Sequence, residues 1–175
     1  TSNASPLDGG AIYAENSEVN STNCSFASNQ NTNNNGGGAL KLSGSTYHDL
    51  NSTFSNNSST SSNSGAASYG GAIMSNDSNI TLNKTIFTGN SAPSKSGGAV
   101  YLSGGHNSII DANFSLNTSD WGGALYLNDS NLTLSNSYLI RNSATASSGG
   151  AIYLNENSSG SFTNNDFKFN SATWG

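Results

Sequence analysis

Asparagine in the pattern Asn-x-Ser/Thr is the residue whose type and spacing most plainly offer chemistry in this sequence. Fourteen such sequons occur in the 175 residues, and each can accept an N-linked glycan wherever a transferase reaches it. Covalent glycans are the only non-protein group that we expect; no cofactor is predicted. The predicted glycan sites are Asn76, Asn79, Asn128, Asn131, Asn20, Asn23, Asn51, Asn83, Asn113 and Asn157.

The placement of four of these sequons supports the prediction. Asn76 and Asn79 match Asn128 and Asn131 in equivalent repeats of the chain. Glycans at matching places would form rows and would help to keep a chain with few charges in solution. In a bacterium that does not glycosylate, the same residues would be bare turn residues.

Residues for acid–base catalysis are few and dispersed. Cleavage of a polysaccharide needs clustered carboxylates, usually with a base or a metal ion close by. The ten acidic residues fall at unrelated repeat positions, and Arg141 is the only arginine. His48 and His106 lie in segments that we expect to be irregular, where neither has an evident partner. The sequence therefore predicts no enzyme and no catalytic residue.

Metal binding is also unsupported by the pattern. Asp8 and Asp120 each stand shortly before a Gly-Gly pair and could ligate Ca²⁺ at a turn. The equivalent positions in the other repeats are not acidic, which favours plain turn residues. Cys24, the only cysteine, is expected to be a buried small side chain. We predict no metal site.

The charge balance excludes some classes of partner. The five basic residues are scattered and the net charge is -5, so no patch for nucleic acid is expected. No segment approaches the roughly 18 apolar residues that a membrane-spanning helix needs. Low charge with high polarity can indicate disorder, but here the apolar residues recur in register.

That register comes from two motifs that alternate along the chain. Gly-Gly-Ala followed by Ile, Leu or Val occurs six times, beginning at Gly9, Gly37, Gly70, Gly97, Gly122 and Gly149. Each copy is followed by an aromatic-x-x-Asn motif, in which Leu139 replaces the aromatic residue of the fifth copy. The Asn residues are Asn29, Asn57, Asn90, Asn117, Asn142 and Asn170.

These motifs, with a weaker run between them such as Asn79–Leu82, give three short β-prone runs per repeat, broken by Gly, Asn and Ser turns. No amphipathic helix fits. The sequence therefore predicts an all-β fold, a right-handed single-stranded parallel β-helix of about six three-strand rungs. The expected single segment, 1–175, divides into repeats 1–29, 30–57, 58–90, 91–117, 118–142 and 143–170, and 171–175 starts another.

Side-chain direction follows from the period of two in a strand. We expect an inward column of Ile12, Leu40, Ile73, Val100, Leu125 and Ile152, and an outward column of Tyr13, Lys41, Met74, Tyr101, Tyr126 and Tyr153. The outward column is either a surface ladder that stiffens the sheet or a stripe that binds a sugar or another partner. We expect the six Asn of the second motif to form a buried or corner ladder, which makes Asn57 and Asn117 the least expected glycan carriers.

The alternation of the two motifs resembles the repeats of bacterial polymorphic outer membrane proteins, over essentially the whole chain. Those proteins are autotransporter-like surface proteins whose β-helical passengers act as adhesins. The resemblance implies a β-helix located outside the cell or on its surface. The translocator barrel of that family has no counterpart in this sequence.

Three functions remain open from the sequence. The first is an extracellular structural solenoid that forms a fibre or a coat, because neither end shows the polar cap that solenoids need. Its partners would be copies of itself end to end or further repeats of the same chain. The second is an adhesin segment that binds a surface or glycan ligand. The third is a fragment of a carbohydrate-active β-helix enzyme.

Overall fold

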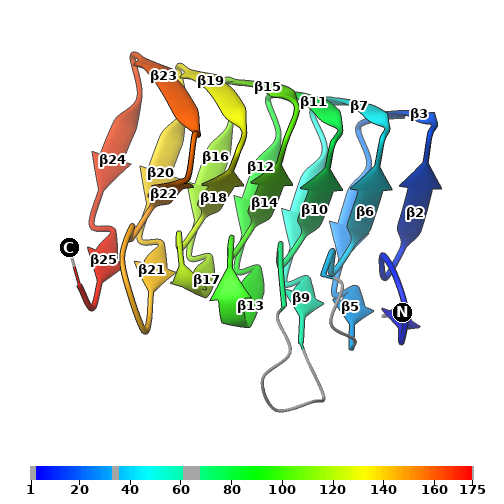
Figure 1. Cartoon of the computed structure of the whole chain (residues 1–175), viewed down its shortest axis with the longest axis horizontal. Coiled ribbons are helices and arrows are strands. Elements are labelled where there is room, and N and C mark those ends of the chain that lie inside the picture. The colour runs from blue at the N-terminus through cyan, green and yellow to red at the C-terminus, as the bar shows by residue number, and fades with distance from the viewer. Residues whose placement is uncertain (1–2, 33–35, 61–67, 175) are drawn as a thin grey trace.

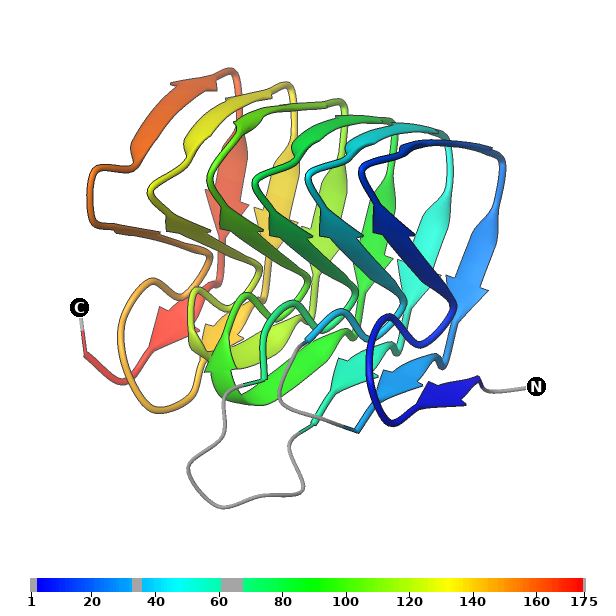
Figure 2. The ribbon, with the colours of Figure 1, turned by 45° about the vertical axis from the view of Figure 1, so that its right-hand side comes forward.

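The computed structural model describes residues 3–32, 36–60 and 68–174, and it is a parallel β-solenoid of about 6 turns (Figures 1 and 2). The described residues contain strands and no helix. Strands pair only with strands of the neighbouring turn, always in parallel. The predicted fold class is confirmed. Parts of the predicted repeats, 1–2, 33–35, 61–67 and residue 175, lie outside the described residues.

Each turn contributes one strand to each of four sheets. The first sheet follows the Gly-Gly pair and contains β2 (Ile12–Glu15), β6 (Leu40–Ser43), β10 (Ile73–Asn76), β14 (Val100–Ser103), β18 (Leu125–Asn128) and β22 (Ile152–Asn155). The second sheet contains β3 (Glu18–Thr22), β7 (Thr46–Leu50), β11 (Asn79–Asn83), β15 (His106–Ile110), β19 (Asn131–Ser135) and β23 (Ser159–Thr163).

The third sheet carries the aromatic-x-x-Asn motif and contains β4 (Ser25–Ala27), β8 (Thr53–Ser55), β12 (Ile86–Thr88), β16 (Asn113–Ser115), β20 (Tyr138–Ile140) and β24 (Asp166–Lys168). The fourth sheet contains β1 (Ala4–Ser5), β5 (Gln30–Asn31), β9 (Ser58–Ser59), β13 (Ser91–Ser96), β17 (Thr118–Trp121), β21 (Ser143–Ala144) and β25 (Ser171–Ala172).

The fourth sheet corrects the expectation of three strands per rung. Most of its strands have two residues, and their polar, small side chains lack the apolar alternation that marks a strand in a sequence. The strands of the middle turns, β9, β13, β17 and β21, still turn a small side chain into the core, where Ser59, Ala92, Ser119 and Ala144 are buried. Four strands therefore enclose the core of each turn.

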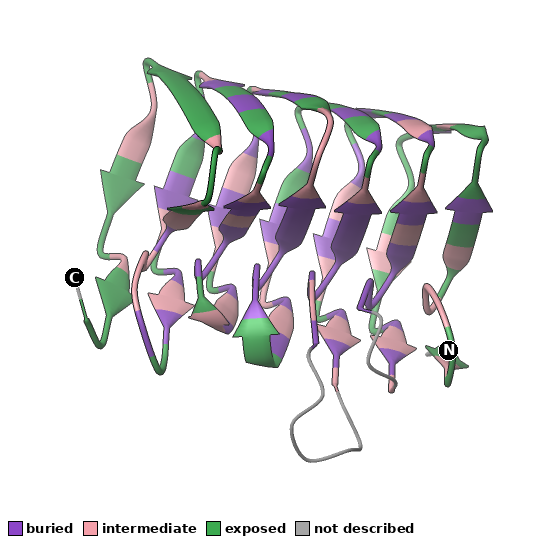
Figure 3. Ribbon diagram, viewed as in Figure 1, coloured by how far each residue is buried: buried purple, intermediate pink, exposed green. Residues whose placement is uncertain are grey.

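The inward column of the first sheet is confirmed. Its six predicted residues pair in register from Ile12 to Ile152. The four middle members are fully buried, whereas Ile12 and Ile152 are half-buried because they lie in the first and last turns. Figure 3 shows this gradient as purple in the middle turns and more green at the two ends.

Phenylalanine forms a second buried column along the third sheet. Phe26, Phe54, Phe87 and Phe114 stack with ring centroids 4.6–4.9 Å apart and nearly parallel planes. Leu139 continues the column in the fifth copy. Offset stacking of this kind adds favourable energy beyond the area that the rings bury.

The corners between the sheets depend on residues with a positive φ. The first glycine of the Gly-Gly pair has φ values such as 60° at Gly70 and 74° at Gly149, where a Cβ would be strained. The second glycine has no space for a side chain, since a Cβ on Gly71 would lie 2.0 Å from the carbonyl oxygen of Gly98. The other three corners use a left-handed residue that is often Asn or Asp.

Replacing Phe87 tests the aromatic column. Phe87→Ala should lower the free energy of unfolding by about 3–5 kcal/mol, because it leaves a cavity between two stacked rings. Phe87→Leu should cost much less, since Leu139 fills the same place two turns away. Denaturant unfolding of the purified protein measures both. Tyr138→Ala, at a half-exposed position of the same sheet, is the control, and equal losses for Tyr138→Ala and Phe87→Ala would contradict the role of the column.

Candidate functional site

The Asn of the second motif forms a continuous hydrogen-bonded ladder at the junction of the third and fourth sheets. In each step the Nδ2 and backbone N–H of one Asn donate to Oδ1 of the Asn in the next turn, as from Asn57 to Asn90 at 3.0 Å for both bonds. The Nδ2 of Asn90 also donates to the Phe54 carbonyl. The middle members of the ladder are buried. The column contains Asn29, Asn57, Asn90, Asn117, Asn142 and Asn170.

The structure adds a seventh member that the motif search missed. Asn3 donates from Nδ2 to Oδ1 of Asn29 at 3.0 Å, and its carbonyl accepts from Gln30 N. No aromatic residue of a preceding repeat marked it in the sequence. The left-handed residue of this corner is not the ladder Asn but the residue before it, such as Asn56 or Gly89.

The predicted glycan sites divide by exposure. Six have exposed side chains: Asn79, Asn131, Asn20, Asn23, Asn51 and Asn157. Four are half-buried: Asn76, Asn128, Asn83 and Asn113. Asn76 and Asn128 lie in one column at the end of first-sheet strands, and the corner between them and the second sheet carries Asp77 and Asp129 with positive φ. The sequons are thus grouped around the corner between the first and second sheets and the corner that follows.

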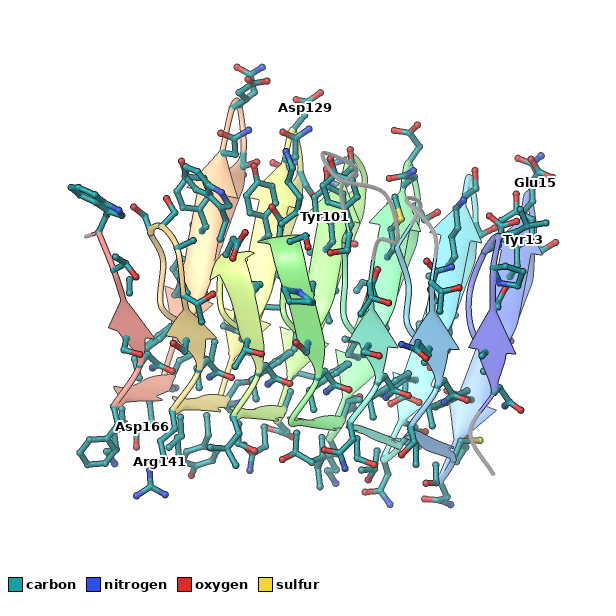
Figure 4. The ribbon with its side chains drawn as sticks, turned by 90° about the horizontal axis from the view of Figure 1, so that it is seen from below. Tyr13, Glu15, Tyr101, Asp129, Arg141 and Asp166 are labelled. Atoms are coloured by element: carbon teal, nitrogen blue, oxygen red, sulfur yellow. The ribbon has the colours of Figure 1, made fainter. Side chains whose placement is uncertain are left out.

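The outer face of the first sheet carries the predicted Tyr column. Tyr101 and Tyr126 stack with centroids 5.4 Å apart, and Tyr126 and Tyr153 with centroids 5.3 Å apart. Figure 4 shows Tyr13 and Tyr101 on one side of the solenoid, opposite Arg141 and Asp166. The side chains point out of the sheet as expected, but Tyr101 is only 9% exposed.

Tyr101 is buried because the segment before each Gly-Gly pair folds over this face. Tyr69 packs on Tyr101 with centroids 4.5 Å apart, and Trp121 stands edge-on to Tyr153 at 5.1 Å and 78°. Tyr69, Ser96 and Trp121 are register partners in successive turns. Ser96 therefore separates two aromatic residues with a small one.

A groove of about 450 Å³ lies where Ser96 leaves space. Tyr126 lines it between the covered rings of Tyr101 and Tyr153, and Tyr69 and Trp121 line it from the covering segment. Polar groups come from Lys95, Asn128 and Asn155, of which Asn155 donates from Nδ2 to Oδ1 of Asn128 at 2.8 Å. We call this groove the aromatic notch. Its size and its mixture of aromatic and amide groups are typical of small-ligand sites.

Comparison with known proteins identifies the repeat. Residues 51–76 and 84–103 match the Chlamydia polymorphic membrane protein (Chlamydia_PMP) repeat. These segments hold two successive copies of the aromatic-x-x-Asn and Gly-Gly-Ala motifs. The matched segments are similar to that repeat, and the β-solenoid agrees with a polymorphic outer membrane protein-like β-helix repeat. No curated protein and no solved structure matches the chain.

The polymorphic membrane protein repeat is a repeat of structural surface proteins and not an enzyme family. It suggests an outer-membrane or surface location. In the described part of the chain, no helix is long and apolar enough to cross a membrane. The described residues contain no group of three or more His, Cys, Asp or Glu side chains that could hold a metal ion.

The residues weighed for catalysis and metal binding lie apart in this repeat structure. Asp8 forms an ion pair with Lys41 at 2.6 Å, and Asp120 Oδ1 accepts a hydrogen bond from Thr145. His48 and His106 are exposed on β7 and β15, so the expectation that they lie in irregular segments was wrong. Each of these strands has a polar residue at one of its inward positions, Asp49 in β7 and Asn107 in β15, and the apolar alternation is therefore hard to recognise in the sequence.

Cys24 also differs from expectation, because its side chain is exposed. Its equivalents Ser52, Thr85 and Ala112 are buried in the middle turns, so the position itself faces inward. Cys24 belongs to the first turn, where a neighbouring turn covers only one side. Cys24 is therefore exposed because it lies in the first turn, and not because its side chain points outward.

A second groove, of about 290 Å³, lies beside β15, β19 and β23. Ser159 Oγ donates to Asn131 Oδ1 at 2.5 Å, and Asn131 Nδ2 lies 3.3 Å from His106 Nδ1. The Ser159 hydroxyl is thus hydrogen-bonded to the Asn131 amide and not to the His106 imidazole, so the groove lacks the Ser–His hydrogen bond of a nucleophilic site. Gly160 pairs with the buried Leu132 of the turn before, and the Phe162 ring occupies the space that a side chain at Gly160 would take.

One buried acid escaped the sequence analysis. Asp49 is 4% exposed and takes an inward position that Leu82 fills in the next turn. It accepts hydrogen bonds from Thr85 Oγ1 at 2.5 Å, from Ser52 N at 3.3 Å, and from Ser21 Oγ. Burial raises the pKa of the adjacent Tyr47 hydroxyl well above its ordinary value. Neither groove reaches this cluster, and its satisfied bonds indicate a structural role.

Replacing Asn90 tests the ladder. Asn90→Ala should lower the free energy of unfolding by about 1–3 kcal/mol, because the Asn57 amide and the Phe54 carbonyl lose buried partners. Denaturant unfolding measures the change. Asn20→Ala, at an exposed strand position with ordinary backbone angles, is the control and should stay within about 0.5 kcal/mol of the parent. Near-zero loss for Asn90→Ala would reduce the ladder to turn chemistry.

Alkaline pH tests the covering of the Tyr column. Burial, followed by the neighbouring Tyr69 and Tyr126, raises the pKa of Tyr101 from 10.0 to about 12. Between these values the unfolded chain releases the proton and the folded chain keeps it, so stability is complete below about pH 10 and falls as the pH rises. Tyr101→Phe should make this fall shallower, by on the order of 2 kcal/mol in total. Denaturant unfolding of the parent and of Tyr101→Phe over this pH range measures the slope of unfolding free energy against pH, and equal slopes for the two proteins would contradict the covering of Tyr101.

Proposed function

We propose that this chain is an extracellular structural β-solenoid that carries N-glycans and takes part in a fibre or coat. The observation that carries the proposal is the in-register stacking of equivalent residues through the described turns. It is most complete in the Asn ladder, where each Asn is hydrogen-bonded to the Asn of the next turn. Such a solenoid is stabilised between neighbouring turns and can be extended without a change of geometry. The polymorphic membrane protein repeat supports a surface setting.

The surface chemistry supports a glycan coat. Charged residues make up 9% of the chain, a low share for a soluble protein surface. Six of the ten predicted glycan sites are exposed, and Asn79 and Asn131 lie in one column of the second sheet. Glycans on this column would project as a row and would hinder lateral association of the sheet faces.

Assembly would use the strand edges of the terminal turns. The strands β2, β3 and β4 on one side, and β22, β23 and β24 on the other, have a neighbouring strand on one edge only. Unpaired edges favour pairing with another strand. We propose that the partner is a further repeat of the same chain or a second copy stacked end to end. The five basic residues are scattered along the chain and the net charge is -5, which disfavours a nucleic acid as partner.

The second candidate is an adhesin segment that binds a surface or glycan ligand. The aromatic notch is the observation that favours it, because the groove interrupts an otherwise regular outer face with partly exposed aromatic and amide groups. The two functions are compatible, since a scaffold and a binding face can share one solenoid.

Native material tests the glycan coat. We expect the intact mass to exceed the 17.9 kDa of these residues, or of the corresponding excised segment, and peptide mapping to find glycans at Asn79 and Asn131 and, less completely, at the half-buried Asn76 and Asn128. Asn57 and Asn117 serve as internal controls, since they are sequons with buried, hydrogen-bonded amides. Unmodified Asn at all four expected positions would remove the coat from the proposal.

Electron microscopy of the same material tests the assembly. Filaments one solenoid wide, or an ordered coat, are the expected result. Separate particles at every concentration would contradict fibre formation through second copies.

A further inference from the structure

The aromatic notch arises because Ser96 is the small residue in a column whose neighbouring members are Tyr69 and Trp121. Tyr69 covers Tyr101 and Trp121 covers Tyr153, each reaching the Tyr of the following turn. By the same geometry Ser96 stands over Tyr126. Among the described rings, Tyr126 contacts only its two ladder neighbours, so its exposed part faces the open groove.

The groove offers aromatic surfaces in more than one orientation. The rings of Tyr101, Tyr126 and Tyr153 lie within 12° of their neighbours, whereas Trp121 stands at 78° to Tyr153 and Tyr69 at 44° to Tyr101. A flat ligand ring can therefore pack against a wall while its edge meets the phenols below. Ligand rings with one apolar C–H face and a rim of hydroxyls suit this arrangement.

The polar groups of the notch repeat with the turns. Two residues after Tyr126 and Tyr153, on the same outer face, come Asn128 and Asn155. These two neighbouring turns thus each present a phenol and an amide, spaced by the separation of the strands, which is about 4.8 Å. A linear polymer whose units are about as long as this spacing can repeat the same contacts from turn to turn.

The net charge of the chain favours an uncharged polymer over a polyanion. Among the described residues that line the notch, Lys95 alone carries a charge. The net charge of the chain is -5, which disfavours polyanions such as nucleic acids. Hydroxyl groups can accept from the amides and the ammonium and donate to the amide oxygens.

We propose that the aromatic notch binds a segment of a neutral linear polysaccharide, with one sugar ring seated over Tyr126 between Tyr69 and Trp121. The proposal rests on the proposed surface location, where such a polymer is met, and it names the site and ligand class of the adhesin function. It depends on neither the glycan coat nor fibre formation.

Titration with defined hexasaccharides tests the proposal. The probes are a hexamer of β-1,4-linked glucose, a hexamer of β-1,4-linked N-acetylglucosamine and a hexamer of galacturonic acid, added to the full chain produced without N-glycans and followed by calorimetry or NMR. At least one neutral hexamer should bind, with an affinity that is insensitive to salt. Binding of the acidic hexamer alone, or of none of the three, would overturn the proposal.

Four variants locate the binding. Tyr126→Ala should weaken it by about tenfold or more, as for a central aromatic anchor, whereas Tyr126→Phe should retain most of it. Ser96→Tyr fills the notch with the ring found at the equivalent Tyr69 and should abolish binding while leaving Tyr126 in place. Tyr13→Ala, in the same column but outside the notch, is the matched control.

Thermal unfolding of each variant separates lost binding from lost structure. Equal binding by the parent and the folded Ser96→Tyr variant would place the ligand elsewhere and contradict the notch. Failure of sugar binding would leave the glycan mapping and the microscopy of native material unaffected, so the two proposals fail separately.

Discussion

In-register parallel pairing between turns is the constraint on which the rest of this structure depends. Because each strand pairs with its equivalent one turn away, every repeat position stacks on the equivalent position of the neighbouring turns along the axis. A residue type can recur along a whole column only if it can contact copies of itself above and below. Glycine at the tight corner, phenylalanine in the core and asparagine at the junction each satisfy this condition differently: by absence of a side chain, by ring stacking and by a self-complementary amide.

The same constraint accounts for the composition. Like charges directly opposite each other on neighbouring strands are destabilising, and in a solenoid a repeated charge would form a full column. Asn, Ser and Thr supply polarity without that repulsion, and their hydroxyls and amides bridge the turns, as Ser45 and Ser78 do to the backbone of the turn before. Asp49 is a buried acid, but its charge does not repeat along the column, because Leu82 takes the equivalent position in the next turn. Ser21, Ser52 and Thr85 donate hydrogen bonds to its carboxylate.

Specific recognition in such a molecule must come from departures from the repeat. A perfectly regular face offers a ligand no preferred place along the axis, whereas one changed residue creates a place. The change from Tyr69 to Ser96 to Trp121 along one column does this on the first sheet. The repeat therefore provides the rigid frame, and its irregular positions provide the candidate sites.

The sequence by itself determined the solenoid, the inward aliphatic column and the residues of the Asn column, because a repeat read along the chain is also the stacking order in space. It did not reveal the fourth sheet, since two-residue strands are too short and polar to show a periodicity. It missed the buried Asp49 cluster, and it placed His48 and His106 outside strands, because a single turn with unusual residues breaks the pattern on which the reading relies. Only the tertiary structure decided that part of the outward Tyr column is covered and that a notch opens at Ser96. Both depend on how the segment before the glycine corner folds over the next turn, a contact between residues about 30 positions apart, such as Tyr69 and Tyr101, that no local pattern encodes.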